Sequence, residues 1–152
     1  MNKTMLDIAN LISSQSPCIR ARVGSLIFRE DRKTILSTGF NGQARKSQLK
    51  LCGGDCCQRD EQGIQSGERI EVGCIHAEVN AISNAACEGI ALEGSSMIVT
   101  APPCLVCAKL IVQSGIKKVY FTSGDRWTHS GLAFLELNGI QLISLQDDNG
   151  KT

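Results

Sequence analysis

The sequence predicts a three-layer α/β/α protein in which helices cover both faces of one five-stranded mixed sheet. Two patterns predict it: helical and β-rich segments alternate three times over residues 76–145, and a helix with a strand hairpin precedes them. Such alternation is typical of parallel strands joined by helical crossovers, and the hairpin adds antiparallel strands. With 152 residues and 42% hydrophobic content, the chain suits a single domain over residues 1–152.

The N-terminal part of the chain predicts one helix and two antiparallel strands. Residues 4–15 carry apolar side chains at helical spacing, and the run ends before Pro17 because the residue preceding a proline avoids helical backbone angles. Residues 23–28 and 34–40 are β-rich and flank a charged turn, which is typical of a hairpin.

The remainder predicts three helix–strand units after a long insertion. Residues 42–73 have no hydrophobic period, so we expect a long loop insertion that is either functional or held by a staple. Gly115 and Gly139 stand where two of the later helices need a residue that tolerates left-handed backbone angles. Helices are expected over 76–86, 104–113 and 130–137, and strands over 96–100, 117–122 and 140–145.

The composition excludes two classes of partner. The net charge is +1, from 16 basic and 15 acidic residues, and only 4% of residues are aromatic. A nucleic-acid polymer is held by basic surfaces and aromatic stacking platforms, so none is expected. The apolar stretches are too short to span a membrane and the first residues lack a signal-peptide core. We therefore expect a soluble protein of the cytoplasm, or of the host cytoplasm if the protein is viral.

Eight cysteines allow either a disulfide framework or metal ligation. Nothing in the sequence suggests secretion, where disulfides are common, and Cys104 and Cys107 have the spacing of metal ligands. Four disulfides would leave no thiolate for a metal, so the two interpretations exclude each other. We expect reduced thiols, some of them bound to metal.

The two most informative motifs are His76-Ala77-Glu78 and Pro103-Cys104-Leu105-Val106-Cys107. One imidazole and two thiolates fill three corners of a tetrahedral zinc site and leave the fourth for water, as in catalytic zinc centres. Glu78 is then an unligated carboxylate that can move protons. Taken singly, each feature has a simpler explanation: a structural half-site or redox pair, a core histidine, or a first-turn carboxylate. The two motifs together favour catalytic zinc.

The predicted elements place these ligands at helix ends. His76 starts one helix, and Cys104 and Cys107 lie in the first turn of the next. The positive ends of both helices then point at the metal, and helix ends and a metal each lower the pKa of a thiol. Two cysteines three residues apart also share one face of a helix.

These motifs and five further segments resemble the cytidine deaminase superfamily, and within it the deoxycytidylate (dCMP) deaminases of cells and phages. The zinc motifs identify the superfamily, whereas the segment through Asn41 and the HAE-x-N-A-I continuation point to dCMP. The resemblance covers nearly the whole chain. The further segments are residues 22–25, 37–42, 63–69, 90–94 and 114–118.

The resemblance implies a cytidine-deaminase-like fold and a zinc-dependent hydrolase that converts dCMP to dUMP and ammonia, supplying dUMP for thymidylate synthesis. It also implies a homo-oligomer, often a hexamer, with dCTP and dTTP as allosteric effectors. Asn41 is implied as a sugar and base contact, which suits an amide that both donates and accepts hydrogen bonds. Alternatively, Asn41 is the turn residue of an Asn-Gly pair. Ala77 is grouped with Asn41 as a substrate-binding candidate.

The 5′-phosphate of such a substrate needs a cation, and the sequence does not choose among those available. Arg20 and Arg22, beside the start of the first strand, are the preferred candidates. The others are Arg45, Lys46, Lys50, Lys117, Lys118 and Arg126.

A second, structural zinc is a further expectation. Cys18, Cys52, Cys74 and one cysteine of the Cys56-Cys57 pair, with Cys57 preferred, could tie the insertion to the catalytic helix. Phage relatives resemble this chain at Cys18 and Cys52 but complete the site with loop histidines, which this loop lacks. Alternatively, Cys18 and Cys74 are small core residues and the loop pair is incidental.

Two competing functions stay open from the sequence. The first is deamination of another small substrate, such as cytidine, deoxycytidine, dCTP or a base. The second is a non-catalytic, zinc-stabilised nucleotide-binding module. The unligated Glu78 argues against the second function, because a structural zinc has no use for a free carboxylate beside it.

Overall fold

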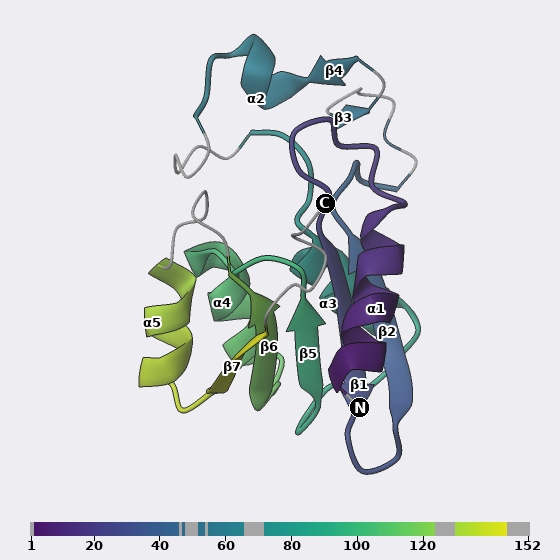
Figure 1. The fold of residues 1–152 in the computed structure, drawn as a ribbon, viewed down its shortest axis with the longest axis vertical. Coiled ribbons are helices and arrows are strands. Elements are labelled where there is room, and N and C mark those ends of the chain that lie inside the picture. The colour runs from purple at the N-terminus through teal and green to yellow at the C-terminus, as the bar shows by residue number, and fades with distance from the viewer. Residues whose placement is uncertain are drawn as a thin grey trace.

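The computed structural model describes residues 2–45, 47, 52–53, 55–65, 72–123 and 130–145. Within these ranges, helices cover both faces of a five-stranded sheet, and a small two-stranded sheet lies in the insertion (Figure 1). In chain order the elements are α1 (Asn2–Ser13), β1 (Gly24–Arg29), β2 (Thr34–Phe40), β3 (Cys52–Gly53), β4 (Cys56–Cys57), α2 (Gln58–Glu61), α3 (Ala77–Cys87), β5 (Ser96–Val99), α4 (Leu105–Gln113), β6 (Lys118–Thr122), α5 (Ser130–Leu137) and β7 (Gln141–Leu145).

The large sheet has the strand order β2-β1-β5-β6-β7. β1 pairs antiparallel with both β2 and β5, whereas β5, β6 and β7 run parallel to one another. The helices α4 and α5 connect the parallel strands, as the alternation in the sequence predicts. The predicted mixed sheet between two helical layers is confirmed.

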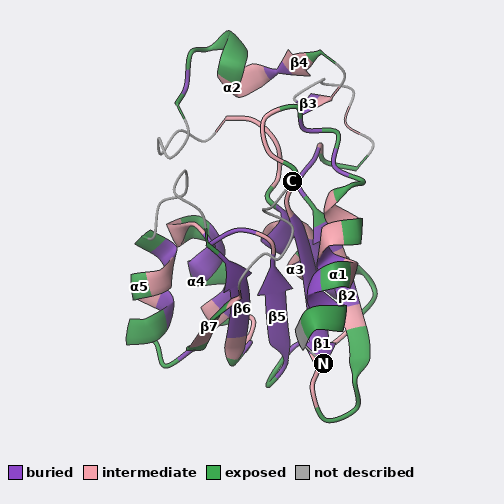
Figure 2. Cartoon of the chain, viewed as in Figure 1, coloured by how far each residue is buried: buried purple, intermediate pink, exposed green. Residues whose placement is uncertain are grey.

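Two apolar cores flank the sheet. Of the described helices, α1 alone packs on one face, where Met5 and Ala9 meet Phe28 of β1. α3, α4 and α5 share the other face, where Ala81 and Ile111 are fully buried. The strands β1 and β5 are buried along nearly their whole length because both of their faces are covered (Figure 2). Among the described residues, no helix is long and apolar enough to cross a membrane.

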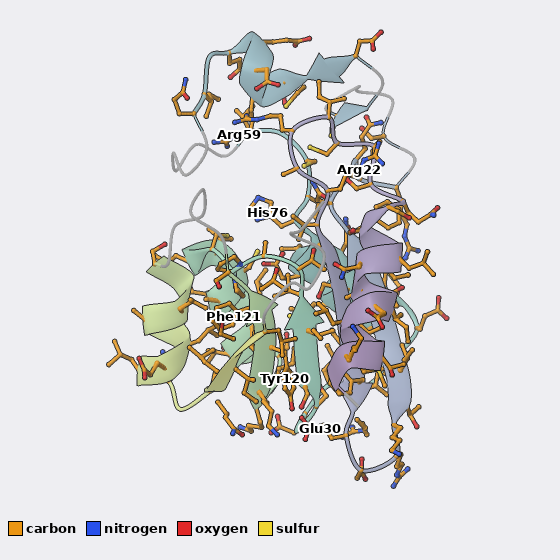
Figure 3. The ribbon with its side chains drawn as sticks, in the orientation of Figure 1. Arg22, Glu30, Arg59, His76, Tyr120 and Phe121 are labelled. Carbon is orange, nitrogen blue, oxygen red and sulfur yellow. The ribbon has the colours of Figure 1, made fainter. Side chains whose placement is uncertain are left out.

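Charged and polar groups close the end of the sheet at which the parallel strands begin. The Glu30 carboxylate accepts hydrogen bonds from Ser96 Oγ at 2.9 Å, Lys118 Nζ at 2.9 Å and Tyr120 Oη at 2.8 Å. A cavity of about 460 Å³ opens here, and no residue of the zinc motifs lines it. Figure 3 shows Glu30 and Tyr120 at this end and His76 at the opposite end. The zinc motif Pro103–Cys107 follows the carboxyl end of β5, where ligands of open α/β sheets usually bind.

The insertion over residues 42–73 is more ordered than the expected plain loop. Its described part contains β3, β4 and the one-turn helix α2. Elements this short have no measurable period, which is why the sequence pattern missed them. Arg20 ties α2 to the loop before β1, with its Nε 3.1 Å from Asp60 Oδ1 and Nη1 donating to Ile64 O at 3.3 Å. That residues 1–152 form a single domain stays a prediction.

Candidate active site

Two helix starts bring three potential zinc ligands together. His76 is the N-cap of α3 and Cys104 is the N-cap of α4, and both have extended backbone angles. Cys107 lies one turn further along α4 and is buried. His76 Nδ1 is 3.5 Å from Cys104 Sγ and 3.4 Å from Cys107 Sγ. The three donor atoms all lie within 4.8 Å of one another.

This donor set fits zinc. A tetrahedral zinc with ordinary bond lengths to nitrogen and sulfur places neighbouring N and S ligands about 3.6 Å apart. The observed separations of 3.4 and 3.5 Å agree with that geometry. Three protein ligands leave the fourth position for water, as in a catalytic site. Within the described part of the chain, no other group of three or more metal-binding side chains meets the 4.8 Å limit.

Hydrogen bonds within the cluster redistribute its protons when no metal is bound. A hydrogen bond from Cys107, aided by His76, lowers the pKa of Cys104 to about 4 although burial opposes the shift. The same thiol–thiol bond raises the pKa of Cys107 above its usual range. Hydrogen bonding to Cys104 raises the pKa of His76 to about 9. Zinc must therefore displace protons from Cys107 and His76, so its binding weakens as the pH falls.

Glu78 is a buried carboxylate beside the three ligands. It lies in the first turn of α3 and is 4% exposed. Burial raises its pKa above the usual carboxyl range, although the charge of His76 and a hydrogen bond with Cys107 act in the opposite direction. A raised pKa suits a group that accepts a proton and returns it near neutral pH.

A glycine of α5 holds the cysteine arm of the site in place. A Cβ at Gly131 would lie 2.0 Å from Pro103 O and 2.7 Å from the carbonyl carbon of Cys104. α5 therefore packs directly on the backbone that positions Cys104. A side chain at residue 131 would have to displace that backbone.

Asn41, the predicted sugar and base contact, is 7% exposed and bonded to the chain itself. Its Oδ1 accepts from Val23 N at 2.8 Å, and its Nδ2 donates to Ala21 O at 2.9 Å and to Cys74 Sγ at 3.7 Å. The amide thus fastens the loop before β1. Contact of Asn41 with substrate stays a prediction, as does that of Ala77, whose side chain is fully buried.

The structure separates the two preferred phosphate candidates. Arg20 is occupied by Asp60 and Ile64, as described above. Arg22 is exposed (Figure 3). Three other candidates already contact side-chain partners, namely Arg45, Lys117 and Lys118. Three lie outside the described residues, namely Lys46, Lys50 and Arg126.

Arg59 of α2 is a cation near the site that sequence reasoning missed. Its Nη2 donates to Gln65 O at 3.0 Å and its Nη1 to Val72 O at 3.4 Å. Its charge acts to lower the pKa of His76, against the larger effect of Cys104. Figure 3 shows Arg59 on the insertion side of His76. No pattern in the insertion pointed to this arginine, because hydrogen bonds to backbone carbonyls have no sequence motif.

The cysteines predicted to hold a second zinc lie near one another. A hydrogen bond from Cys74 lowers the pKa of Cys18 to about 5. Burial and the charge of Cys18 raise the pKa of Cys52 to about 11. Cys57 lies opposite Cys52 in the β3–β4 pair. The four thiols are less tightly gathered than the donors around His76, since they do not meet the 4.8 Å limit.

The structure also distinguishes the two neighbouring loop cysteines. Cys57 is buried, whereas Cys56 is half-buried and its Sγ donates to Glu61 Oε1 at 3.0 Å. Cys57 is therefore the better placed fourth ligand. All eight cysteines are free thiols.

An α/β sheet with a His-Cys-Cys donor set and a buried, unligated carboxylate defines a zinc-dependent hydrolase. Residues 1–123 match the family model described as the cytidine and deoxycytidylate deaminase zinc-binding region. The chain belongs to this family of zinc-dependent deaminases, which confirms the resemblance, the enzyme class and the zinc cofactor predicted from its motifs.

Individual relatives agree with this placement. Deoxycytidylate deaminase of Enterobacteria phage T4 is 34% identical over 96% of this chain and 90% of its own length. Deoxycytidylate deaminase of Saccharomyces cerevisiae is 33% identical over 89% of this chain, but only over 41% of its own length. The crystal structure of dCMP deaminase from the cyanophage S-TIM5, in complex with dCMP and dUMP, has a TM-score of 0.78 at 27% identity. The match covers 95% of this chain and 96% of that one.

Replacing Gly131 with alanine tests whether α5 positions the cysteine arm. In an ordinary helix this change is stabilising, because alanine is the better helix former. Here the new Cβ collides with the Pro103–Cys104 backbone, so we expect a loss of roughly 1–3 kcal/mol in unfolding free energy. Zinc affinity should also fall, as measured by chelator competition. Ser130→Ala, at an exposed position of the same helix, is the control, and equal behaviour of the two variants would contradict the role of Gly131.

Proposed function

We propose that the protein is a dCMP deaminase, which hydrolyses dCMP to dUMP and ammonia. The observation that carries the proposal is the buried Glu78 beside three zinc ligands, because a structural zinc centre needs no such carboxylate. The deoxycytidylate deaminases among the relatives, including those of phage T4 and cyanophage S-TIM5 that are covered over at least nine-tenths of their length, support dCMP as the substrate.

Glu78 carries the protons in the proposed reaction. Zinc held by His76, Cys104 and Cys107 would supply the Lewis acidity that makes water a nucleophile near neutral pH. Glu78 takes one proton from the attacking water and passes it to the ring nitrogen, while the water oxygen adds to the ring carbon bearing the amine. Glu78 then carries the remaining proton of that water to the amine, which leaves as ammonia. The raised pKa of Glu78 favours acceptance of the proton from water.

The proposal extends to the setting of the enzyme. The dUMP formed would supply thymidylate synthesis. The proposed location is the cytoplasm, or the host cytoplasm for a viral protein, because its reducing conditions suit the eight free thiols. Val106 and Leu110, two exposed apolar residues one turn apart on α4, support a homo-oligomer, whereas the hexamer rests on the resemblance to dCMP deaminases. Regulation by dCTP and dTTP rests on the resemblance to dCMP deaminases.

Ammonia release from a matched substrate panel tests the proposed substrate. Zinc-loaded protein is given dCMP, deoxycytidine, CMP or dCTP, each with and without added dCTP and dTTP. We expect kcat/KM to be highest for dCMP, because both the 5′-phosphate and the deoxyribose are then recognised. Preference for deoxycytidine would exclude a nucleotide substrate, and zinc-dependent binding of dCMP without ammonia release would favour a non-catalytic module.

Replacing Glu78 with glutamine tests the proton carrier. We expect kcat to fall roughly 10²- to 10⁴-fold, because glutamine keeps the shape of the side chain but cannot exchange protons. Zinc content should stay at the wild-type level, because Glu78 is not among the clustered donors. Glu88→Gln, at the exposed C-terminal end of α3, is the matched control. Near-normal turnover by the Glu78→Gln variant would rule out this role.

We also propose that Cys18, Cys52, Cys57 and Cys74 hold a second, structural zinc. Four thiols suit a closed tetrahedral site, and the low pKa of Cys18 favours the thiolate that zinc requires. Such a site would join the loop before β1, the β3–β4 pair and the segment before α3. It would therefore fasten the insertion two residues ahead of His76.

Metal analysis tests the second zinc. We expect two zinc ions per chain in the wild-type protein and one in the Cys52→Ala variant, with a lower unfolding temperature, because the insertion loses its tie. Cys87→Ala, at an exposed position late in α3, should keep both ions. A single zinc in wild-type protein purified without chelators would refute the second site.

A further inference from the structure

Two asparagines of α3 donate hydrogen bonds to backbone carbonyls at the open edge of the large sheet. Asn80 Nδ2 donates to Phe40 O at 2.7 Å, and Asn84 Nδ2 donates to Thr38 O at 2.8 Å. Among the described residues, β2 is an edge strand of the large sheet, with β1 as its one neighbouring strand. Asn41 N bonds across to Val23 O, so the alternating Thr38 and Phe40 carbonyls point away from β1. The two side-chain amides thus take the place of a missing neighbouring strand.

The spacing of the two asparagines matches the spacing of the two carbonyls. Residues four apart on a helix advance by about 6.0 Å along its axis, at about 1.5 Å per residue. Residues two apart on a strand advance by about 6.6 Å. One helix can therefore donate hydrogen bonds to two successive outward carbonyls only when it runs alongside the strand at one fixed position along the strand axis. Asn80 pairs with the later strand residue and Asn84 with the earlier one, so α3 runs antiparallel to β2.

Two further contacts fix the same position of α3 along β2. Ser37 Oγ donates to Ala81 O at 2.7 Å. A Cβ at Gly39 would lie 2.4 Å from both Ala77 O and Ala81 N, so the two backbones are in direct contact there. Any sliding of α3 along β2 must break all of these contacts together.

The height of α3 decides whether the zinc ligands meet. His76 and Glu78 are positioned by α3, whereas Cys104 and Cys107 are positioned by α4. α4 is held separately, between β5 and β6 in the chain and against Gly131 of α5. Residues 41–76 connect β2 to α3, and a backbone bridge between Gly42 and Ile75 ties the end of this connection to the end of β2. Metal ligands must hold their distances to within about 0.2 Å. The contacts of α3 with β2, together with this bridge, therefore supply the precision from the α3 side.

We propose that Asn80 and Asn84 are positioning residues that set the register of α3 on β2, and through it the reach of His76 and Glu78 to the zinc site. The activity part of this proposal rests on the proposed deaminase function. The metal-binding part does not, because it depends only on the three ligands meeting.

The test replaces each amide with its isosteric acid, as Asn80→Asp, Asn84→Asp and the double variant. A carboxylate keeps the side-chain shape but faces the carbonyl without a donor, and the Asn84→Asp variant would keep the acceptor oxygen that Arg45 contacts. Asn138→Asp is the matched control, because Asn138 Nδ2 makes a 2.8 Å bond to Phe134 O at the C-terminal end of α5. Each protein is titrated with Co²⁺, and its thiolate-to-cobalt absorption and chelator competition are recorded. The Cys52→Ala variant is titrated in parallel, so that absorption from the proposed second site can be separated.

We expect each single variant to bind Co²⁺ roughly 10- to 100-fold more weakly than wild type, with an altered absorption spectrum, while Asn138→Asp is unchanged. The added negative charge alone would tighten binding of a divalent cation, so weaker binding reports displaced ligands. With dCMP as substrate, kcat should fall by roughly the same factor, because Glu78 is displaced together with α3. KM should change by less than about threefold.

Wild-type Co²⁺ affinity and spectrum in both single variants would overturn the proposal, even if their melting temperatures fell. Self-association of the variants with unchanged metal binding would also overturn it, since the asparagines would then only shield the strand edge. If the double variant does not fold, the single variants decide, because each keeps one amide bond. If wild type binds Co²⁺ as expected but releases no ammonia from dCMP, the proposed function fails while the positioning role is still measured.

Discussion

The approach of His76 Nδ1 to the sulfurs of Cys104 and Cys107 is the contact on which the rest of this structure depends. It joins two helices that are separated by β5 in the sequence and pack on the same face of the sheet. Neither helix can bind zinc alone, because α3 offers one ligand and α4 offers two. The sheet therefore fixes the position of one helix relative to the other. The buried Glu78 is positioned together with His76, because both belong to the start of α3.

Each arm of the site is held by backbone contacts that leave no room for a side chain. Gly131 lets α5 rest on the backbone at Cys104, and Gly39 lets β2 rest on the start of α3. The asparagine bonds then fix where α3 stands along β2. The insertion reaches the same helix through Cys74, which contacts both Cys18 and Asn41 just before His76. A change in any of these supports should appear first as weaker metal binding.

The sequence predicted the sheet, its helical layers and the zinc ligands because these depend on periodicity and on motifs of fixed spacing. The strand order was not predictable, since apolar runs such as residues 96–99 do not specify their neighbours. The short elements of the insertion lack a period, and the carbonyl bonds of Arg59 carry no motif. The bonds of Asn80 and Asn84 left one usable signal, two asparagines four residues apart on a mostly apolar helix, but their partner strand became evident only in three dimensions.

Anomalous diffraction at the zinc edge from crystals of the zinc-loaded protein tests the central claim most directly. We expect an anomalous peak bonded to His76 Nδ1 and to the sulfurs of Cys104 and Cys107, with a solvent molecule as fourth ligand and Glu78 unligated beside it. A peak only at the cluster around Cys18, a disulfide between Cys104 and Cys107, or direct ligation by Glu78 would contradict it.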